Sequence, residues 1–202
     1  MKQESSKRTL IIEAAIEEFQ SNGFERASMD RISERASVSK RTVYKHFECK
    51  ITLFGKVIDE MTARMKDPAP VQFNPDLPVR EQLLSLGHHK GKLLQSKQFM
   101  QLVRIAMSET LRDPCLAKAL NQRSDGVGEY AQFFRDAVAS GLLSADDPAK
   151  VEGQFIGLIK SKAFWPSIFS GEVPAAPEME KVIEEAADVI VSAYGARLSA
   201  VS

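Results

Sequence analysis

The sequence predicts an all-α fold. Apolar residues recur at helical spacing through most of the chain, and no segment shows the alternation of a β-strand. Ser, Asp, Gly and Pro residues interrupt the apolar stripes where helices are expected to begin and end, which divides the chain into about nine helices. With 202 residues, the chain can form one large core or two small domains.

The first helix is expected from Ser6 to Asn22. Its apolar residues lie on one face and its acidic residues on the other, and Gly23 follows as the glycine that ends the helix. This helix is interpreted as the scaffold for the two that follow. The apolar set is Ile12, Ala15, Ile16 and Phe19, and the acidic set is Glu13, Glu17 and Glu18.

Two short helices separated by a tight polar turn are predicted within residues 28–54. The first begins at about Met29 with Ser28 as its N-cap, and the second covers residues 40–47 with Ser39 as its N-cap. This succession of helix, turn and helix is the pattern of a helix-turn-helix.

The second short helix is predicted to serve both a core and a nucleic acid. Val43 and Phe47 are four residues apart and share the inward face. The rest of its surface carries cations, hydroxyl groups and an aromatic ring, which suit phosphate oxygens and base edges in a major groove. We expect base-edge or mixed contacts from Lys40, Arg41, Thr42 and Lys45, and phosphate contacts from Ser28, Tyr44, His46 and Lys50.

Residues 8–60 resemble the DNA-binding domain of the tetracycline-repressor (TetR) family of transcriptional regulators. Ser37 departs from the family pattern, which usually has glycine in this turn, and a serine there is costly if its φ is positive. The residues that carry the resemblance are Phe19, Gly23, Phe24, Ser28, Ile32, Ala36 to Ser39, Thr42 to Phe47, Lys50 and Leu53.

A basic helix taken alone is more often a solvated face than a DNA contact, but the complete two-helix pattern favours DNA binding. The charge distribution agrees. Residues 1–66 carry 13 Lys and Arg against 10 Asp and Glu, a net charge of +3. Residues 67–202 carry 14 Lys and Arg against 17 Asp and Glu, a net charge of −3. The formal net charge of zero is therefore the sum of a basic N-terminal part and an acidic C-terminal part.

A domain boundary is predicted within residues 67–78, which hold four prolines. We therefore expect a helix-turn-helix domain over residues 1–66, including a connector helix from about residue 50, and a second helical domain over residues 67–202. In the second domain, helices are expected over residues 79–96 and 99–111 and from Asp113 to about Ser140. A further helix is expected to begin at Asp147 and to be ended or kinked by Pro166. The last helix is expected after a loop over residues 171–177.

The resemblance implies that the second domain binds a small effector. Aromatic and Met side chains at helical spacing are more often core than pocket, yet as a group they leave room for an apolar ligand cavity. The candidate ligand-binding residues are Phe99, Val103, Met107, Tyr130, Phe134, Phe155 and Trp165.

A homodimer is expected from the last two long helices. The final helix has a broad apolar face that needs a partner, and the resemblance implies pairing through these helices. Two-fold symmetry then places the recognition helices about 34–36 Å apart, which predicts a palindromic operator in double-stranded DNA.

The remaining features argue against an enzyme and against a cofactor or metal. Adjacent His88 and His89 point in different directions and are interpreted as polar helix residues, while Cys49 and Cys115 are interpreted as free thiols. We find no phosphate loop and no catalytic motif. Charges interrupt every apolar run short of the ~18 residues of a membrane span, and residues 1–8 lack a signal-peptide core, so a cytoplasmic protein is expected.

Three alternatives stay open at this point. Two of them keep the same fold and function class: a regulator without a small effector, and an activator instead of a repressor. The third belongs to another class: a helical binding or enzyme-like module whose helix-turn-helix is vestigial. The basic side chains of Arg41, Lys45 and Lys50 speak against the vestigial form.

Overall fold

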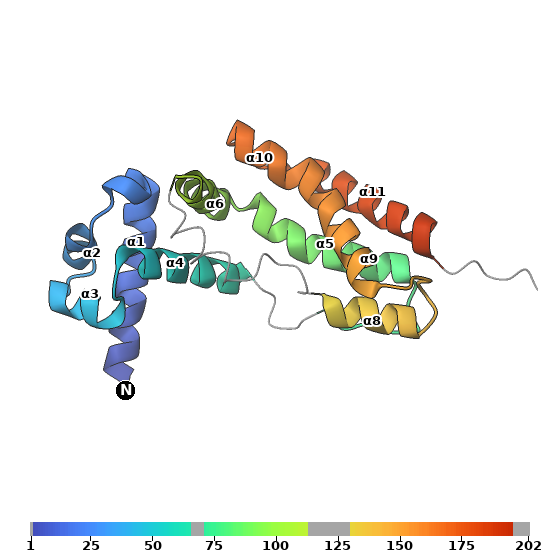
Figure 1. Cartoon of the computed structure of the whole chain (residues 1–202), viewed down its shortest axis with the longest axis horizontal. Coiled ribbons are helices and arrows are strands. Elements are labelled where there is room, and N and C mark those ends of the chain that lie inside the picture. The colour runs from blue at the N-terminus through green and yellow to red at the C-terminus, as the bar shows by residue number, and fades with distance from the viewer. Residues whose placement is uncertain (1, 66–70, 113–129, 196–202) are drawn as a thin grey trace, which may run out of the picture. The chain divides into compact units, whose positions relative to one another are not determined.

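The computed structural model of the chain describes residues 2–65, 71–112 and 130–195 (Figure 1). These residues form helices joined by turns and loops, and their β-structure is limited to one isolated bridge between Leu143 and Gly195. The predicted all-α fold is therefore confirmed. No helix in these ranges is long and apolar enough to cross a membrane.

The helices group into two compact units. The first comprises residues 1–65 and 98–123, and the second comprises residues 66–97 and 124–202. The domain boundary between residues 66 and 67 remains a prediction. Helix α6 (Lys97–Thr110) follows that boundary in the sequence but packs with the first unit.

The first unit begins with the helices that the sequence predicted. Gly23 has a non-helical backbone with a φ of 72° and a ψ of 174°, so it interrupts α1 where the sequence placed the end of the first helix, and a short helical segment of three residues follows it. The prediction of Met29 as the start of the next helix is confirmed. The bounds are α1 Lys2–Arg26, α2 Met29–Arg35, α3 Lys40–His46 and α4 Lys50–Met65.

Three phenylalanine rings form the centre of this unit. Phe19 of α1 lies 4.9 Å from Phe54 of α4 between ring centroids, and Phe24 lies 5.1 Å from Phe54. Both contacts have the edge-to-face geometry that aromatic pairs favour. Leu102 of α6 is fully buried in the same cluster, and Phe99 packs against it. The same core therefore joins α1, α4 and α6.

Glu18 corrects one prediction. The sequence placed it on the polar side of the first helix, but its side chain is fully buried. Its carboxylate oxygens lie 2.6 Å from Nε of Arg31 and 3.5 Å from Nε of Arg35, both on α2. Ile11 and Ala14 precede Glu18 on a second buried row of α1, so the buried face is broader than the predicted stripe.

Burial and charge act in opposite directions on this carboxyl. Burial raises the pKa of Glu18, but the hydrogen bond and charge of Arg31, followed by hydrogen bonds from the backbone of Ser28 and from Arg35, outweigh it. The pKa of Glu18 therefore lies below its ordinary value, and the carboxylate stays ionised inside the protein.

The second unit contains α5 and the helices from α8 onward. Asp147 caps α9 as predicted, since its Oδ1 accepts a hydrogen bond from the N–H of Ala149 at 3.0 Å. The start predicted at Asp113 lies outside the described residues. The bounds are α5 Val79–Gln95, α8 Ala131–Ala139, α9 Pro148–Ile159, a π-helical turn Lys160–Phe164, α10 Trp165–Ser170 and α11 Ala176–Tyr194.

Two prolines lie within helices. Of the two outcomes predicted at Pro166, an end of the helix or a kink, the end is excluded, because the chain continues from the π-helical turn as α10 to Ser170. Pro177 lies inside the first turn of α11, where its missing N–H removes no helical hydrogen bond, so the loop is shorter than expected. With α9, the π turn and α10 counted as one helix, the described residues form nine helices.

Close contact between α5 and α11 holds the second unit together. Gly87 and Gly91 of α5 face α11, which runs beside α5 in Figure 1. A Cβ atom at Gly87 would lie 2.3 Å from Cγ2 of Ile183, and one at Gly91 would lie 3.1 Å from Cγ of Met179. The close approach of the two helices therefore requires glycine at Gly87, and glycine at Gly91 leaves room for the side chain of Met179.

We predict that Gly87→Ala destabilises the protein by about 1–3 kcal/mol, because the new methyl group collides with the branched side chain of Ile183. Chemical denaturation measures the change in free energy of unfolding. Gly91→Ala is the matched comparison and should cost less, since the flexible side chain of Met179 can move aside. Equal stability of Gly87→Ala and the wild type would contradict the packing described above.

Candidate nucleic-acid interface

Two serine caps and a strained turn set the geometry of the helix-turn-helix. The Oγ atom of Ser28 accepts a hydrogen bond from the N–H of Arg31 at 3.1 Å, and Oγ of Ser39 accepts one from the N–H of Thr42 at 3.2 Å. Ser37 has a φ of 51°, the left-handed conformation in which glycine is usual. These local interactions fix where α3 begins and how it leaves the turn.

The α3 helix presents the predicted residues on two faces. Val43 and Phe47 are buried in the core, as expected. Arg41, Tyr44 and Lys45 are exposed on the outer surface, where the side chain of Tyr44 is 51% exposed. An exposed surface with two cations and a phenol can donate hydrogen bonds to phosphate oxygens and base edges.

Thr42 and His46 lie at the margins of this surface and are half-buried. The hydroxyl of Thr42 shares a hydrogen bond of 2.8 Å with that of Ser39, so it also stabilises the start of α3. The ring of His46 lies 6.3 Å from that of Phe47. Their DNA contacts, like those of Ser28, stay predictions.

Lys40 is engaged with another side chain. Its Nζ lies 2.5 Å from Oδ2 of Asp30, a residue in the first turn of α2. The hydrogen bond to Asp30 raises the pKa of Lys40 above its ordinary value. Sequence reasoning missed Asp30, because the residues lie ten positions apart and only the turn brings them together.

Lys50 is also held by the protein. Its Nζ donates to the backbone carbonyl of Glu25 at 3.0 Å and to that of Ala27 at 3.1 Å, and it lies 4.6 Å from the ring centroid of Phe24. Two of the three N–H donors of the ammonium are thus used by carbonyls at the end of α1 and in the segment that follows it. Burial, the largest effect, lowers the pKa of Lys50 below its ordinary value.

The seven predicted ligand-binding residues divide between the two units. Phe99, Val103 and Met107 lie on α6 in the first unit, and the other four lie in the second. The structure brings Phe134 and Phe155 together, with both side chains fully buried and ring centroids 6.1 Å apart.

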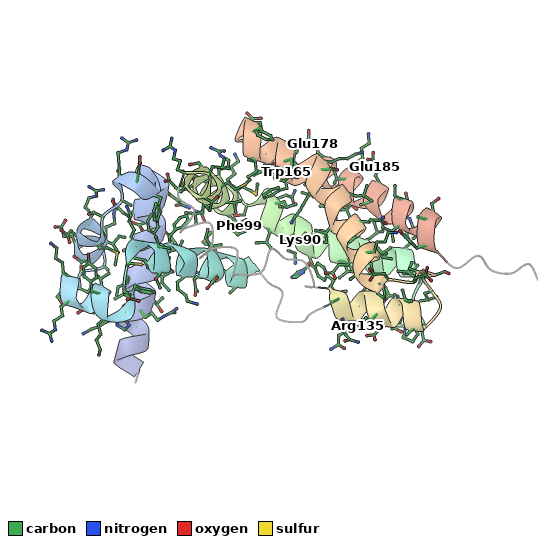
Figure 2. The ribbon with its side chains drawn as sticks, in the orientation of Figure 1. Lys90, Phe99, Arg135, Trp165, Glu178 and Glu185 are labelled. Atoms are coloured by element: carbon green, nitrogen blue, oxygen red, sulfur yellow. The ribbon has the colours of Figure 1, made fainter. Side chains whose placement is uncertain are left out.

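Trp165 differs from these buried residues. It lies at the start of α10 (Figure 2), and its side chain is 45% exposed. Its ring stacks on that of Phe169, which is 82% exposed, with centroids 6.5 Å apart. Trp165 therefore belongs to an exposed aromatic pair and not to the buried aromatic cluster.

A polar network that the sequence did not predict lies beside the buried aromatic residues. The hydroxyl of Tyr130 and Nδ1 of His89 are 2.8 Å apart, and the backbone N–H of Tyr130 donates to Oε1 of Glu152 at 2.9 Å. The side chain of Glu152 is only 1% exposed. In the sequence, the position of Glu152 beside Val151 in an otherwise apolar part of α9 was the one feature that could have indicated a buried carboxylate.

The two adjacent histidines have separate partners. Nε2 of His88 lies 2.7 Å from Oε2 of Glu180, whereas His89 contacts Tyr130. Among the described residues, no three His, Cys, Asp or Glu side chains are placed to hold a metal ion. Cys49 is an exposed free thiol, and Cys115 lies outside the described residues.

Two family models match the chain. The model described as "Bacterial regulatory proteins, tetR family" matches residues 11–57, which include the helix-turn-helix. The model described as "AefR-like transcriptional repressor, C-terminal domain" matches residues 81–196, more than half of the chain.

Individual proteins agree with these matches. The HTH-type transcriptional regulator UidR of Escherichia coli strain K12 is 34% identical over 146 residues, which cover 69% of this chain and 70% of UidR. A TetR family transcriptional regulator from Pseudomonas syringae has a TM-score of 0.77 and 36% identity over 94% of this chain and 97% of its own. The flavonoid-responsive regulator FrrA has a TM-score of 0.75 and 28% identity over 95% of this chain and 98% of its own.

We predict that Lys50→Ala lowers the free energy of unfolding by about 1–3 kcal/mol, because two backbone carbonyls lose a charged donor. Thermal and chemical denaturation measure this change. Arg41→Ala removes a cation from the exposed face of α3 and should stay within about 0.5 kcal/mol of the wild type. If both variants were equally stable, Lys50 would not hold the segment between α1 and α2 in place.

Proposed function

Because the chain belongs to the TetR family of bacterial transcriptional regulators, we propose that it is a cytoplasmic repressor. In this proposal, a homodimer binds a palindromic operator through α3, and a small apolar effector releases it. Regulation of transcription and DNA binding are properties of the family, and its members are not enzymes.

The exposed surface of α3 carries the proposal. Arg41, Tyr44 and Lys45 project from one side of a helix whose other side is fixed in the core by Val43 and Phe47. A helix held in this way can enter a major groove with little rearrangement. The vestigial alternative is disfavoured, since a helix without function needs neither the exposed cations nor the strained turn at Ser37.

Exposed apolar side chains support the homodimer. Trp165 and Phe169 on α10 present a stacked aromatic pair, and Val189 on α11 is 48% exposed. On α9, Gly153 and Gly157 are exposed and four residues apart, and no atom lies within 4 Å of a Cβ built at either position. The exposed aromatic pair offers apolar surface, and the two glycines let another helix approach closely. Both features suit contact with the same surface of a second copy of the chain.

The interior of the second unit supports an apolar effector with a hydrogen-bonding group. Phe134 and Phe155 supply aromatic surface, while Tyr130, His89 and Glu152 supply polar atoms that can orient a ligand. FrrA, a relative that responds to flavonoids, makes a flavonoid the first compound to test. Trp165, which the sequence suggested for this site, is assigned here to the dimer surface.

Fluorescence anisotropy with duplex fragments from upstream of the protein's own gene tests this proposal. We expect tight binding to one fragment. The slope of log K against log[salt] should correspond to several phosphate contacts. Addition of a flavonoid, followed by a panel of aromatic compounds, should then release the protein. Binding that is weak and equal on every fragment would contradict a specific operator there, and tighter binding with an effector would contradict release.

We predict that Lys45→Ala weakens binding to every duplex and reduces the slope of log K against log[salt] by about one, because one phosphate contact is lost. The same anisotropy titration at several salt concentrations measures the slope. Arg41→Ala is the comparison and should relax the preference at one operator position by ~1–3 kcal/mol if its guanidinium binds guanine. An unchanged slope for Lys45→Ala would reject its phosphate contact.

We predict that Phe169→Glu raises the dissociation constant of the dimer about 10- to 100-fold, because a charge replaces an aromatic anchor at the interface. Sedimentation equilibrium measures this constant. Leu77→Glu is the matched control, since Leu77 is 46% exposed in the turn before α5 and should leave the dimer intact. Dimers of equal stability in both variants would place the interface elsewhere.

A further inference from the structure

An ion pair joins the first turns of the two helices in the helix-turn-helix. Lys40 is the first residue of α3 and Asp30 is the second residue of α2, and their charged atoms lie 2.5 Å apart. The side chain of Lys40 is 61% exposed and that of Asp30 is 51% exposed. The pair therefore lies at the surface, where Lys40 can exchange one anionic partner for another.

The position of this pair matters for DNA binding. The first residues of a recognition helix reach the base edges and flanking phosphates. An ammonium that is bound to a carboxylate releases no counterion from DNA until it leaves that carboxylate. Asp30 therefore withholds Lys40, one of the three Lys and Arg side chains on α3.

The other acidic group that acts on Lys40 does not replace this restraint. Glu34 affects Lys40 only through an electrostatic interaction that is weaker than the Asp30 contact. The two arginines of α2 are engaged elsewhere, because Arg31 contacts Glu18, and Arg35 contacts Glu17 and Glu18. Of these ion pairs of α2, the one made by Asp30 reaches a cation of α3.

We propose that Asp30 limits the affinity of the helix-turn-helix for duplex DNA by competing with phosphate for the ammonium of Lys40. The inference rests on the proposed function of α3. In the free protein Lys40 is bound to Asp30, and it contacts a phosphate only after that bond breaks. The competition weakens binding to arbitrary sequence, which matters because a genome offers a large excess of nonspecific sites.

The test is the affinity of the full-length protein for a labelled duplex of arbitrary sequence, measured by anisotropy at several salt concentrations. Asp30→Asn should tighten binding about two- to fivefold, the range that follows from the strength of exposed ion pairs. It should also steepen the salt slope by up to about one, because Lys40 then neutralises a phosphate in a larger fraction of the complexes.

A double substitution separates competition from a general charge effect. In the Lys40→Gln background, Asp30→Asn should change affinity little, because the cation for which Asp30 competes is absent. If removal of a negative charge near DNA were the whole cause, the same tightening would persist without Lys40. That result would overturn the inference.

Asp59→Asn is the matched control. Asp59 pairs with Lys56 on α4 at 2.9 Å, and both partners are similarly exposed, so the substitution makes the same charge change away from the helix-turn-helix. We expect it to leave affinity and salt slope unchanged. Melting temperatures of all variants should confirm that they are folded at the temperature of measurement.

The outcomes are distinct. Tighter binding by Asp30→Asn that requires Lys40 supports the inference. Unchanged or weaker binding overturns it, and weaker binding would make Asp30 a residue that orients Lys40 towards DNA. A wild-type protein that binds no duplex at low salt would refute the proposed function, and this inference with it.

Discussion

The buried carboxylate of Glu18 is the constraint on which the DNA-binding unit depends. It leaves water only because Arg31 and Arg35 of α2 supply opposite charges, and its ionised form persists because those charges outweigh the cost of burial. The guanidinium of Arg31 also donates to the carbonyl of Arg26 near the end of α1. The orientation of α2 on α1 is thereby fixed, and the direction of α3 follows from it.

The α4 helix is fastened to the same scaffold at both of its ends. Lys50, at its start, donates to the carbonyls of Glu25 at the end of α1 and Ala27 just after it, and an Nη atom of Arg64, near its end, lies 3.3 Å from Oε2 of Glu13 on α1. The aromatic cluster around Phe54 fills the space between. Any displacement of α4 therefore acts on the helices that present α3, so this unit moves as a whole or breaks one of these contacts.

The second unit is organised by a different constraint, the close approach of two helices. Glycines on α5 allow α11 to pack against it, and the buried aromatic residues of α8 and α9 complete the interior. The π-helical turn before Pro166 lets the chain continue as α10, which carries Trp165 and Phe169 at the surface. The same unit thus has a buried aromatic interior and an exposed aromatic pair on α10.

The sequence by itself determined the helices and their caps, because these depend on neighbouring residues. Ser28, Ser39 and Asp147 begin helices through hydrogen bonds to residues two or three positions ahead, and helical spacing identified Val43 as core. Only the tertiary structure decided that Glu18 is buried and that Asp30 holds Lys40. Each of these contacts joins different helices, and a charged side chain looks the same in sequence whether water or an opposite charge surrounds it. The free energy of a charge depends on its surroundings in space, which only the packed helices define.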